Sequence, residues 1–169
     1  MNHGPFDWPR GPRISFSLQE EAGVYALFLR DAAVLPGIEP SANGLIYIGL
    51  AANRNGLRGR CHFDARTRNH SPRKSLAVLL LEDLLLTPVL IIKPNSSDTW
   101  GLDGPSDARL SAWMHDNLEL AIEICPDPDG RETELVGRYI APRAVGQYLA
   151  VCPTRSPSPH CDRYPCCGG

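Results

Sequence analysis

Three short apolar segments stand out along the chain as candidate strands. Residues 23–31 read Gly-Val-Tyr-Ala-Leu-Phe-Leu-Arg-Asp and residues 45–50 read Leu-Ile-Tyr-Ile-Gly-Leu, both rich in β-branched and aromatic side chains. Residues 118–125 alternate large apolar residues with acidic or small ones, which is the period of a half-buried strand. Asn43-Gly44 is a turn signal before the second segment. Because the first two segments are so close in sequence, we expect them to pair antiparallel.

Two helices are predicted in the middle of the chain. Residues 56–65 can form a short helix with Leu57 and Cys61 on one face, since residues four apart are neighbours on a helix. A stronger helix is expected to begin at Ser71-Pro72, where serine is a good N-cap and proline suits the first helical position. Its broad apolar face continues to about Leu86.

The later part of the chain is predicted to add two more helices and short connections. Ser106 can cap a helix over residues 107–117, and residues 131–140 carry an apolar side typical of a helix. We expect a strand or an extended connection at residues 88–93, a polar loop at residues 96–104 and one more short strand at residues 145–151.

Composition favours a single globular domain, and the predicted elements give it an α/β (α+β) class, with a small, mostly antiparallel sheet of about three strands flanked by helices. The chain has 169 residues, of which 43% are hydrophobic and 21% are charged. We predict an N-terminal extension at residues 1–20, the folded domain at residues 21–145, and a Pro/Cys-rich, poorly ordered tail at residues 146–169.

The chain also lacks the features of membrane and secreted proteins. No apolar run reaches the roughly 18 to 20 residues that a membrane span requires. The first twelve residues carry no apolar signal-peptide core. We therefore expect a cytoplasmic protein without a membrane partner.

Positive charge is concentrated in one segment, although the whole chain has a net charge of −2. Residues 54–74 contain seven cations and one anion, a local net charge of +6. Such a basic stripe is the electrostatic signature of phosphate binding, and it can equally be a solvated surface. The seven cations are Arg54, Arg58, Arg60, Arg66, Arg68, Arg73 and Lys74.

Two tripeptides on the first two predicted strands give the chain a family resemblance. Gly23-Val24-Tyr25 is followed, 22 residues after its tyrosine, by Tyr47-Ile48-Gly49. The pair resembles the GIY-YIG nuclease superfamily, and residues 67–76 and 110–114 are similar to an uncharacterised bacterial subgroup. The likeness covers about residues 20–142. It implies a metal-dependent endonuclease that hydrolyses phosphodiester bonds in DNA.

Two later segments resemble the remaining motifs of this superfamily. Leu57-Arg58-Gly59-Arg60-Cys61 is similar to its arginine-bearing helix and selects Arg60 as the functional arginine, with Arg58 and His62 as the alternative pair. The stretch from Glu132 to Val136 resembles its Glu-x-x-Leu-Ile segment, which puts Glu132 in the metal-ligand position.

The resemblance implies a role for each of these side chains in phosphodiester hydrolysis, which requires an activated water and a cation beside the developing charge. Tyr25 or Tyr47 would activate or position the water, and Arg60 would steady the phosphate. Glu132 would hold one Mg²⁺ or Mn²⁺, since a single carboxylate with waters and substrate oxygens suits such an ion. The period of a strand turns both tyrosines to one face, which Gly23 and Gly49 are expected to keep open to a phosphate backbone.

Further cations are predicted to bind the DNA backbone rather than the bases. His70, Arg73 and Lys74 lie at the start of a predicted helix, where free backbone N–H groups favour phosphate. Arg58, His62 and Arg68 complete the predicted nucleic-acid-binding set.

One departure from the superfamily pattern leaves other functions open. The superfamily usually has an asparagine in the turn after its glutamate helix, and this chain has no asparagine after Asn117. A related domain that only binds nucleic acid is therefore an alternative, as is an interaction domain in which the motifs arose by chance. The histidine and cysteines of the tail lack the paired Cys-x-x-Cys spacing of common zinc modules.

Overall fold

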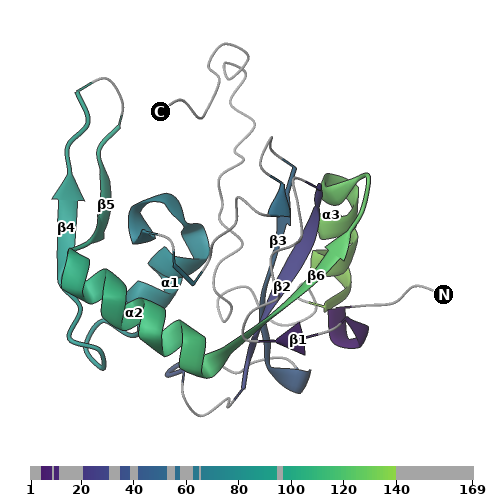
Figure 1. The fold of residues 1–169 in the computed structure, drawn as a ribbon, viewed down its shortest axis with the longest axis horizontal. Coiled ribbons are helices and arrows are strands. Elements are labelled where there is room, and N and C mark those ends of the chain that lie inside the picture. The colour runs from purple at the N-terminus through teal and green to yellow at the C-terminus, as the bar shows by residue number, and fades with distance from the viewer. Residues whose placement is uncertain are drawn as a thin grey trace.

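The computed structural model describes residues 5–8, 10–11, 21–30, 35–38, 42–52, 56–57, 63–64, 66–94 and 97–139. It has an α+β fold, as the sequence predicted, built on an antiparallel sheet with the strand order β1-β6-β2-β3. Helices α1 and α2 lie on one side of this sheet, α3 lies on the other, and β4 and β5 form a separate two-stranded sheet (Figure 1). The strands are β1 (Arg10–Gly11), β2 (Gly23–Leu29), β3 (Leu45–Ala51), β4 (Pro88–Ile91), β5 (Thr99–Leu102) and β6 (Leu118–Ile124), and the helices are α1 (Ser71–Leu79), α2 (Gly104–Asn117) and α3 (Pro128–Tyr139).

The three full-length strands of the main sheet are those predicted from the sequence. Strand β2 is central and pairs antiparallel with both β3 and β6. The turn signal before β3 is also confirmed, because Asn43 and Gly44 have φ angles of 68° and 80°. Asparagine and glycine adopt this left-handed region more readily than other residues.

Strand β2 is buried on both of its sides, and alternate residues enter two different apolar clusters. Tyr25 and Leu27 join the cluster that α1 and α2 cover. Val24 and Phe28 join the cluster that α3 covers. Burial on both faces explains why β2 reads as a nearly continuous apolar run instead of an alternating one.

Helix α1 is shorter than the sequence predicted. It ends at Leu79 and residues 80–85 form turns, with Leu85 at a φ of 49°. The side chain of Arg109 holds these turns by donating to the carbonyl oxygens of Leu84 and Leu85 at 2.9 and 2.7 Å. The prediction for the start was also off by one residue, because His70 is the N-cap and Ser71 the first helical residue.

The predicted polar loop at residues 96–104 is wrong, because it contains β5 and the start of α2. Asp103 is the N-cap of α2, and its side chain accepts a hydrogen bond from the backbone N–H of Ser106 at 2.8 Å. Ser106, the predicted cap, is instead buried, and its hydroxyl oxygen accepts from the backbone N–H of Thr87 at 2.9 Å. Strand β4 is confirmed, and it pairs with β5.

The described residues near the start of the chain, 5–8 and 10–11, pack on the domain. Strand β1 pairs with β6, and Trp8 is buried in the cluster beneath α3. The guanidinium of Arg10 lies 3.9 Å above the ring of Phe28. The folded unit therefore includes Trp8, Arg10 and Gly11, which lie within the predicted extension at residues 1–20.

Several predicted features lie outside the described residues. They include most of the predicted helix at residues 56–65, the strand predicted at residues 145–151 and the tail at residues 146–169. Within the part of the chain that the structure describes, no helix is both long and apolar enough to cross a membrane.

Candidate functional site

The two motif tyrosines lie side by side on the main sheet. Tyr25 pairs with Gly49 in the β2–β3 register, and Tyr47 lies two residues before that glycine. The tyrosine rings are stacked, with centroids 5.8 Å apart and planes 25° apart. The prediction that both point to one face is therefore confirmed. Only 3% of Tyr25 is exposed, whereas Tyr47 is partly exposed, so Tyr47 is the more accessible of the two.

Gly49 makes room for this pair of rings. A Cβ atom at residue 49 would lie 2.5 Å from the Tyr25 hydroxyl oxygen and 2.6 Å from Cε1 of Tyr47. At Gly23, a Cβ atom would meet the carbonyl oxygen of Glu123 and would lie 2.9 Å from Cδ1 of Leu57. The expectation that these glycines leave the face open to a phosphate backbone is therefore wrong, because neighbouring protein atoms fill both spaces.

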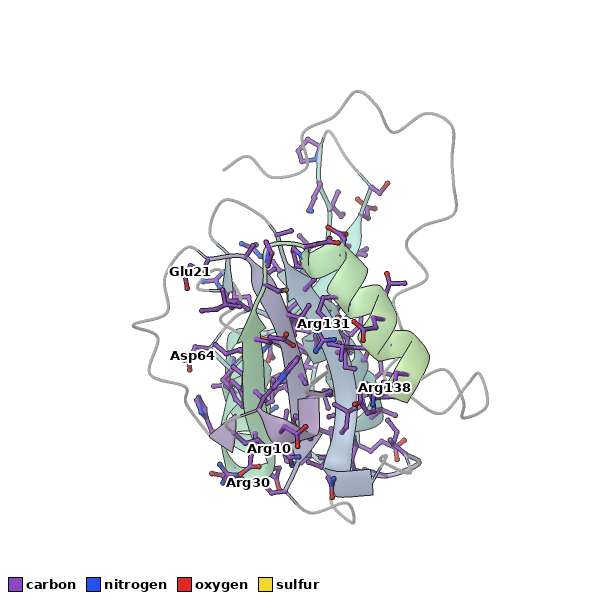
Figure 2. The ribbon with its side chains drawn as sticks, turned by 90° about the vertical axis from the view of Figure 1, so that its right-hand side faces the viewer. Arg10, Glu21, Arg30, Asp64, Arg131 and Arg138 are labelled. Carbon is purple, nitrogen blue, oxygen red and sulfur yellow. The ribbon has the colours of Figure 1, made fainter. Side chains whose placement is uncertain are left out.

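Glu132 lies on α3, which covers the opposite face of the sheet from the tyrosines. Leu135, one turn further along α3, is fully buried in the cluster that contains Val24 and Phe28. Figure 2 looks onto this face and shows α3 in front of the strands, with Arg131 and Arg138 labelled on it. Glu132 itself is partly buried. The structure thus brings the two tyrosines together but places the glutamate in a different layer.

Two acidic side chains near Glu132 form ion pairs with Arg131. Arg131 contacts the carboxylates of Glu123 at 2.9 Å and Glu134 at 2.7 Å. Burial of Arg131 lowers its pKa, but these hydrogen bonds outweigh that effect and the net shift is upward. No three His, Cys, Asp or Glu side chains among the described residues are grouped as a metal site.

The described part of the basic segment presents Arg68 and Lys74 beside strand β5, with Arg66 exposed two residues before Arg68. Arg66 and Arg68 are exposed, and Lys74 is partly exposed. The Lys74 ammonium donates to the hydroxyl oxygen of Thr99 at 2.9 Å and lies 5.6 Å from the ring centroid of Trp100. His70 is partly exposed as well. Of the predicted site residues, Arg58, Arg60 and His62 lie outside the described residues.

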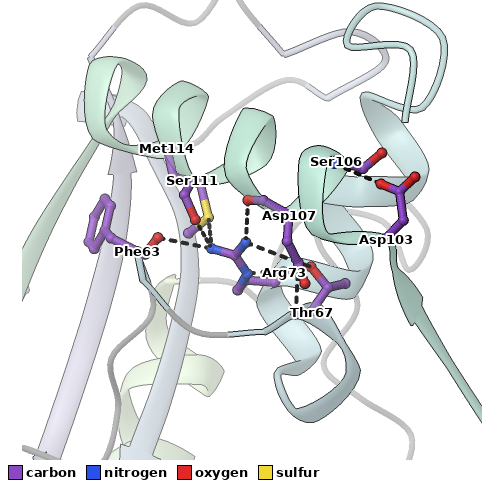
Figure 3. Close-up of polar contacts among 8 residues, drawn as sticks. All are labelled: Phe63, Thr67, Arg73, Asp103, Ser106, Asp107, Ser111 and Met114. Carbon is purple, nitrogen blue, oxygen red and sulfur yellow. Dashed lines mark hydrogen bonds and ion pairs between the residues drawn. The ribbon is translucent and has the colours of Figure 1, made fainter. Parts of the chain in front are cut away.

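Arg73 is not at the surface, which contradicts the prediction that it contacts DNA. Its side chain is fully buried, and its guanidinium forms an ion pair with Asp107 at 3.3 Å (Figure 3). Further hydrogen bonds run to the Phe63 carbonyl and the Ser111 hydroxyl, both at 3.0 Å. Burial lowers the pKa of Arg73, and Asp107 opposes that shift. A guanidinium enclosed in this way cannot also bind a phosphate.

Sequence reasoning missed the partners of Arg73. Asp107 lies in the first turn of α2, where a carboxylate is ordinarily explained by the helix dipole. Ser111 follows four residues later, so the two residues share one face of α2. That i, i+4 pair of polar residues was the only signal of an inward polar site, and it does not identify the arginine 34 residues earlier.

Comparison with known proteins identifies no relative of this chain. No protein-family model matches the chain, and no curated protein or solved structure matches it either. Its function is therefore argued from its own residues.

Proposed function

We propose that this protein is a metal-dependent endonuclease of GIY-YIG type that hydrolyses DNA phosphodiester bonds in the cytoplasm. The observation that carries the proposal is the stacked pair of Tyr25 and Tyr47 on adjacent antiparallel strands. Two tyrosine rings from separate strands stack beside Gly49, where an added Cβ atom would meet the Tyr25 hydroxyl and the Tyr47 ring. This arrangement supports the resemblance of the two tripeptides to the superfamily motifs.

Tyr47 is the better placed of the two tyrosines to meet a water molecule, because it is the more exposed. A tyrosine hydroxyl has an ordinary pKa of about 10, so it needs a neighbouring cation to act as a base near neutral pH. Arg60, or Arg58 with His62, would supply that charge and hold the phosphate. Tyr25, buried beside Tyr47, would orient its ring.

Glu132 would hold Mg²⁺ or Mn²⁺, which supplies positive charge against the charge that develops on the phosphate oxygens. Arg68, His70 and Lys74 would bind the DNA backbone, with Arg58 and His62. Arg68 and Lys74 lie within one turn of the start of α1 and beside β5, so together they can follow a strand of phosphates. Such contacts fix the DNA in place without reading its sequence.

A second candidate function is DNA binding without cleavage. The observation in its favour is the position of Glu132 on α3, across the sheet from the tyrosines. Cleavage needs the metal and the activated water at the same phosphate, because both act on one reacting centre. The missing asparagine after residue 117 points the same way.

Nicking of supercoiled plasmid with Mg²⁺ or Mn²⁺ tests the proposal. We expect wild type to nick the plasmid and Tyr47→Phe to lower the rate by about 10² to 10⁴, the usual contribution of a general base. Glu132→Ala should remove nicking. Glu134→Ala is the matched control, because Glu134 is an exposed acidic residue on the same helix and its ion pair with Arg131 contributes little.

The outcomes separate the candidates. Wild-type protein that binds DNA in a salt-dependent way but never nicks it would reject the nuclease function and support DNA binding without cleavage. Nicking that survives Glu132→Ala would remove Glu132 from the proposed metal site. Absence of salt-dependent DNA binding would reject both functions.

A further inference from the structure

We infer that Arg73 is a positioning residue, which holds residues 63–68 in place from inside the protein so that Arg66 and Arg68 face the DNA. The part of this inference that concerns DNA rests on the proposed function. The anchoring itself rests only on contacts within the protein.

One guanidinium joins three parts of the chain. Arg73 belongs to α1, and its Nη1 atom donates to the carbonyl oxygen of Phe63 at 3.0 Å. Its Nη2 atom donates to the backbone and side-chain oxygens of Asp107 on α2, at 3.1 and 3.3 Å. The segment before α1 is thereby tied to both helices that cover the tyrosine face of the sheet.

Thr67 is the second anchor of the same segment. It is fully buried, and both its backbone N–H and its hydroxyl donate to Oδ1 of Asp107. Arg73 Nε donates in turn to the Thr67 hydroxyl oxygen at 3.4 Å. The residues on either side of Thr67, Arg66 and Arg68, are exposed. Because Thr67 is held in place, the backbone positions from which the Arg66 and Arg68 side chains extend are also held in place.

Arginine is the residue type that this site requires. Its planar fork carries five N–H donors that can reach several acceptors in one plane, and it stays charged when buried beside a carboxylate. A lysine would offer one ammonium group in place of that fork. Without the guanidinium, the Phe63 carbonyl and the Asp107 carboxylate would each lose a buried partner.

A preformed segment favours DNA binding because less freedom is lost when the phosphates are bound. Ordering a loop or a long side chain on binding weakens affinity, and a segment that is already ordered avoids this loss. Arg73 would therefore raise DNA affinity without touching DNA. Its signature differs from that of a phosphate contact, which shows itself in the salt dependence of binding.

Two measurements on Arg73→Lys test the inference. Hydrogen exchange of the free protein should become faster at residues 63–68 while β2 and β6 keep their protection. DNA affinity should fall by about tenfold with the wild-type salt slope. Arg68→Ala is the control for a direct contact, because it should leave exchange unchanged and reduce the salt slope by about one.

Thr67→Val is a second, milder variant that keeps the Arg73–Asp107 ion pair, so the test does not depend on the folding of Arg73→Lys. It should loosen the same residues and weaken DNA binding in the same way. Unchanged exchange at residues 63–68 in both variants would overturn the anchoring. A loosened segment with wild-type DNA affinity, or a reduced salt slope in Arg73→Lys, would overturn the positioning role. Wild-type protein that fails to bind DNA would instead reject the proposed function, whatever the exchange data show.

Discussion

The two faces of the main sheet are covered in different ways. On the face of Tyr25 and Tyr47, helices α1 and α2 enclose an apolar cluster next to a buried ion pair between Arg73 and Asp107. On the face of Phe28, α3 and Trp8 enclose an apolar cluster, and Arg10 and Arg131 lie at its edge; the buried polar side chains among the described residues, Thr67, Arg73 and Ser106, all lie on the other face.

This difference suggests separate roles: the face covered by α1 and α2 carries most of the candidate site, and the face covered by α3 mainly stabilises the fold. A buried charge network is costly unless every partner is present, so a layer that contains one has a closely defined geometry. The tyrosines and the described part of the basic segment, residues 66–74, belong to that layer. The α3 layer has the composition of an ordinary hydrophobic core, and among the proposed site residues that the structure describes, Glu132 alone belongs to it. Of the residues in the nuclease proposal, Glu132 therefore has the weakest structural support, because it lies in a different layer from the tyrosines.

Phe28→Ala should have the largest effect on stability, and it tests whether the α3 layer is mainly support. Phe28 is fully buried, so we expect the free energy of unfolding to fall by about 3–5 kcal/mol in urea titrations. DNA affinity per folded molecule should stay at the wild-type value. Its neighbour Leu27, buried on the tyrosine face, provides the matched variant Leu27→Ala. Equal loss of DNA affinity in both folded variants would contradict the division into two faces.

Gly49→Ala should have an intermediate effect and should act on the tyrosine face. The added methyl group must displace the Tyr25 hydroxyl and the Tyr47 ring, which we expect to cost about 1–3 kcal/mol of stability. Because both rings move, nicking should fall further than the loss of folded protein explains. Gly137→Ala is the control, since a Cβ atom there meets nothing within 4 Å. Wild-type nicking by Gly49→Ala would show that the stacked geometry is not needed.

Asp103→Ala should have the smallest effect, and it reports on the helix that covers the tyrosine face. Hydrogen bonds from Ser106 lower the pKa of Asp103, so the folded state favours the ionised carboxylate. Its contribution to stability is present above the ordinary pKa of about 4 and is lost as the pH falls through the lowered value. The difference in melting temperature between wild type and Asp103→Ala should therefore be larger at pH 7 than in acid, where Asp103 is protonated. A difference that is the same size at both pH values would contradict this role.

The sequence predicted those elements whose pattern is local. Strands β2, β3 and β6 were found because each is a seven-residue apolar or alternating run. Strand β5 was missed because its four residues, Thr-Trp-Gly-Leu, lie between polar stretches that resemble a loop. The end of α1 was missed because leucines continue through residues 80–86, although the backbone turns there.

Of the candidate site, the sequence predicted the positions of the residues on strands and not those of the residues on helices. Period two, with the register that pairs Tyr25 with Gly49, places Tyr25 and Tyr47 on one face. The burial of Arg73 could not be predicted, because it depends on Asp107 in another helix. The layer occupied by Glu132 depends on the side of the sheet to which the chain crosses after β6, and no residue spacing specifies that side.

The pairing of β1 with β6 has a practical consequence for handling the protein. An uncovered strand edge offers its backbone groups to other chains and promotes aggregation. The two residues of β1, held down by Trp8 and by Arg10 against Phe28, occupy that edge. An expression boundary placed at residue 21 would remove this cover and leave β6 open along its length. We therefore expect a protein that begins at residue 21 to aggregate more readily than one that keeps Trp8, Arg10 and Gly11.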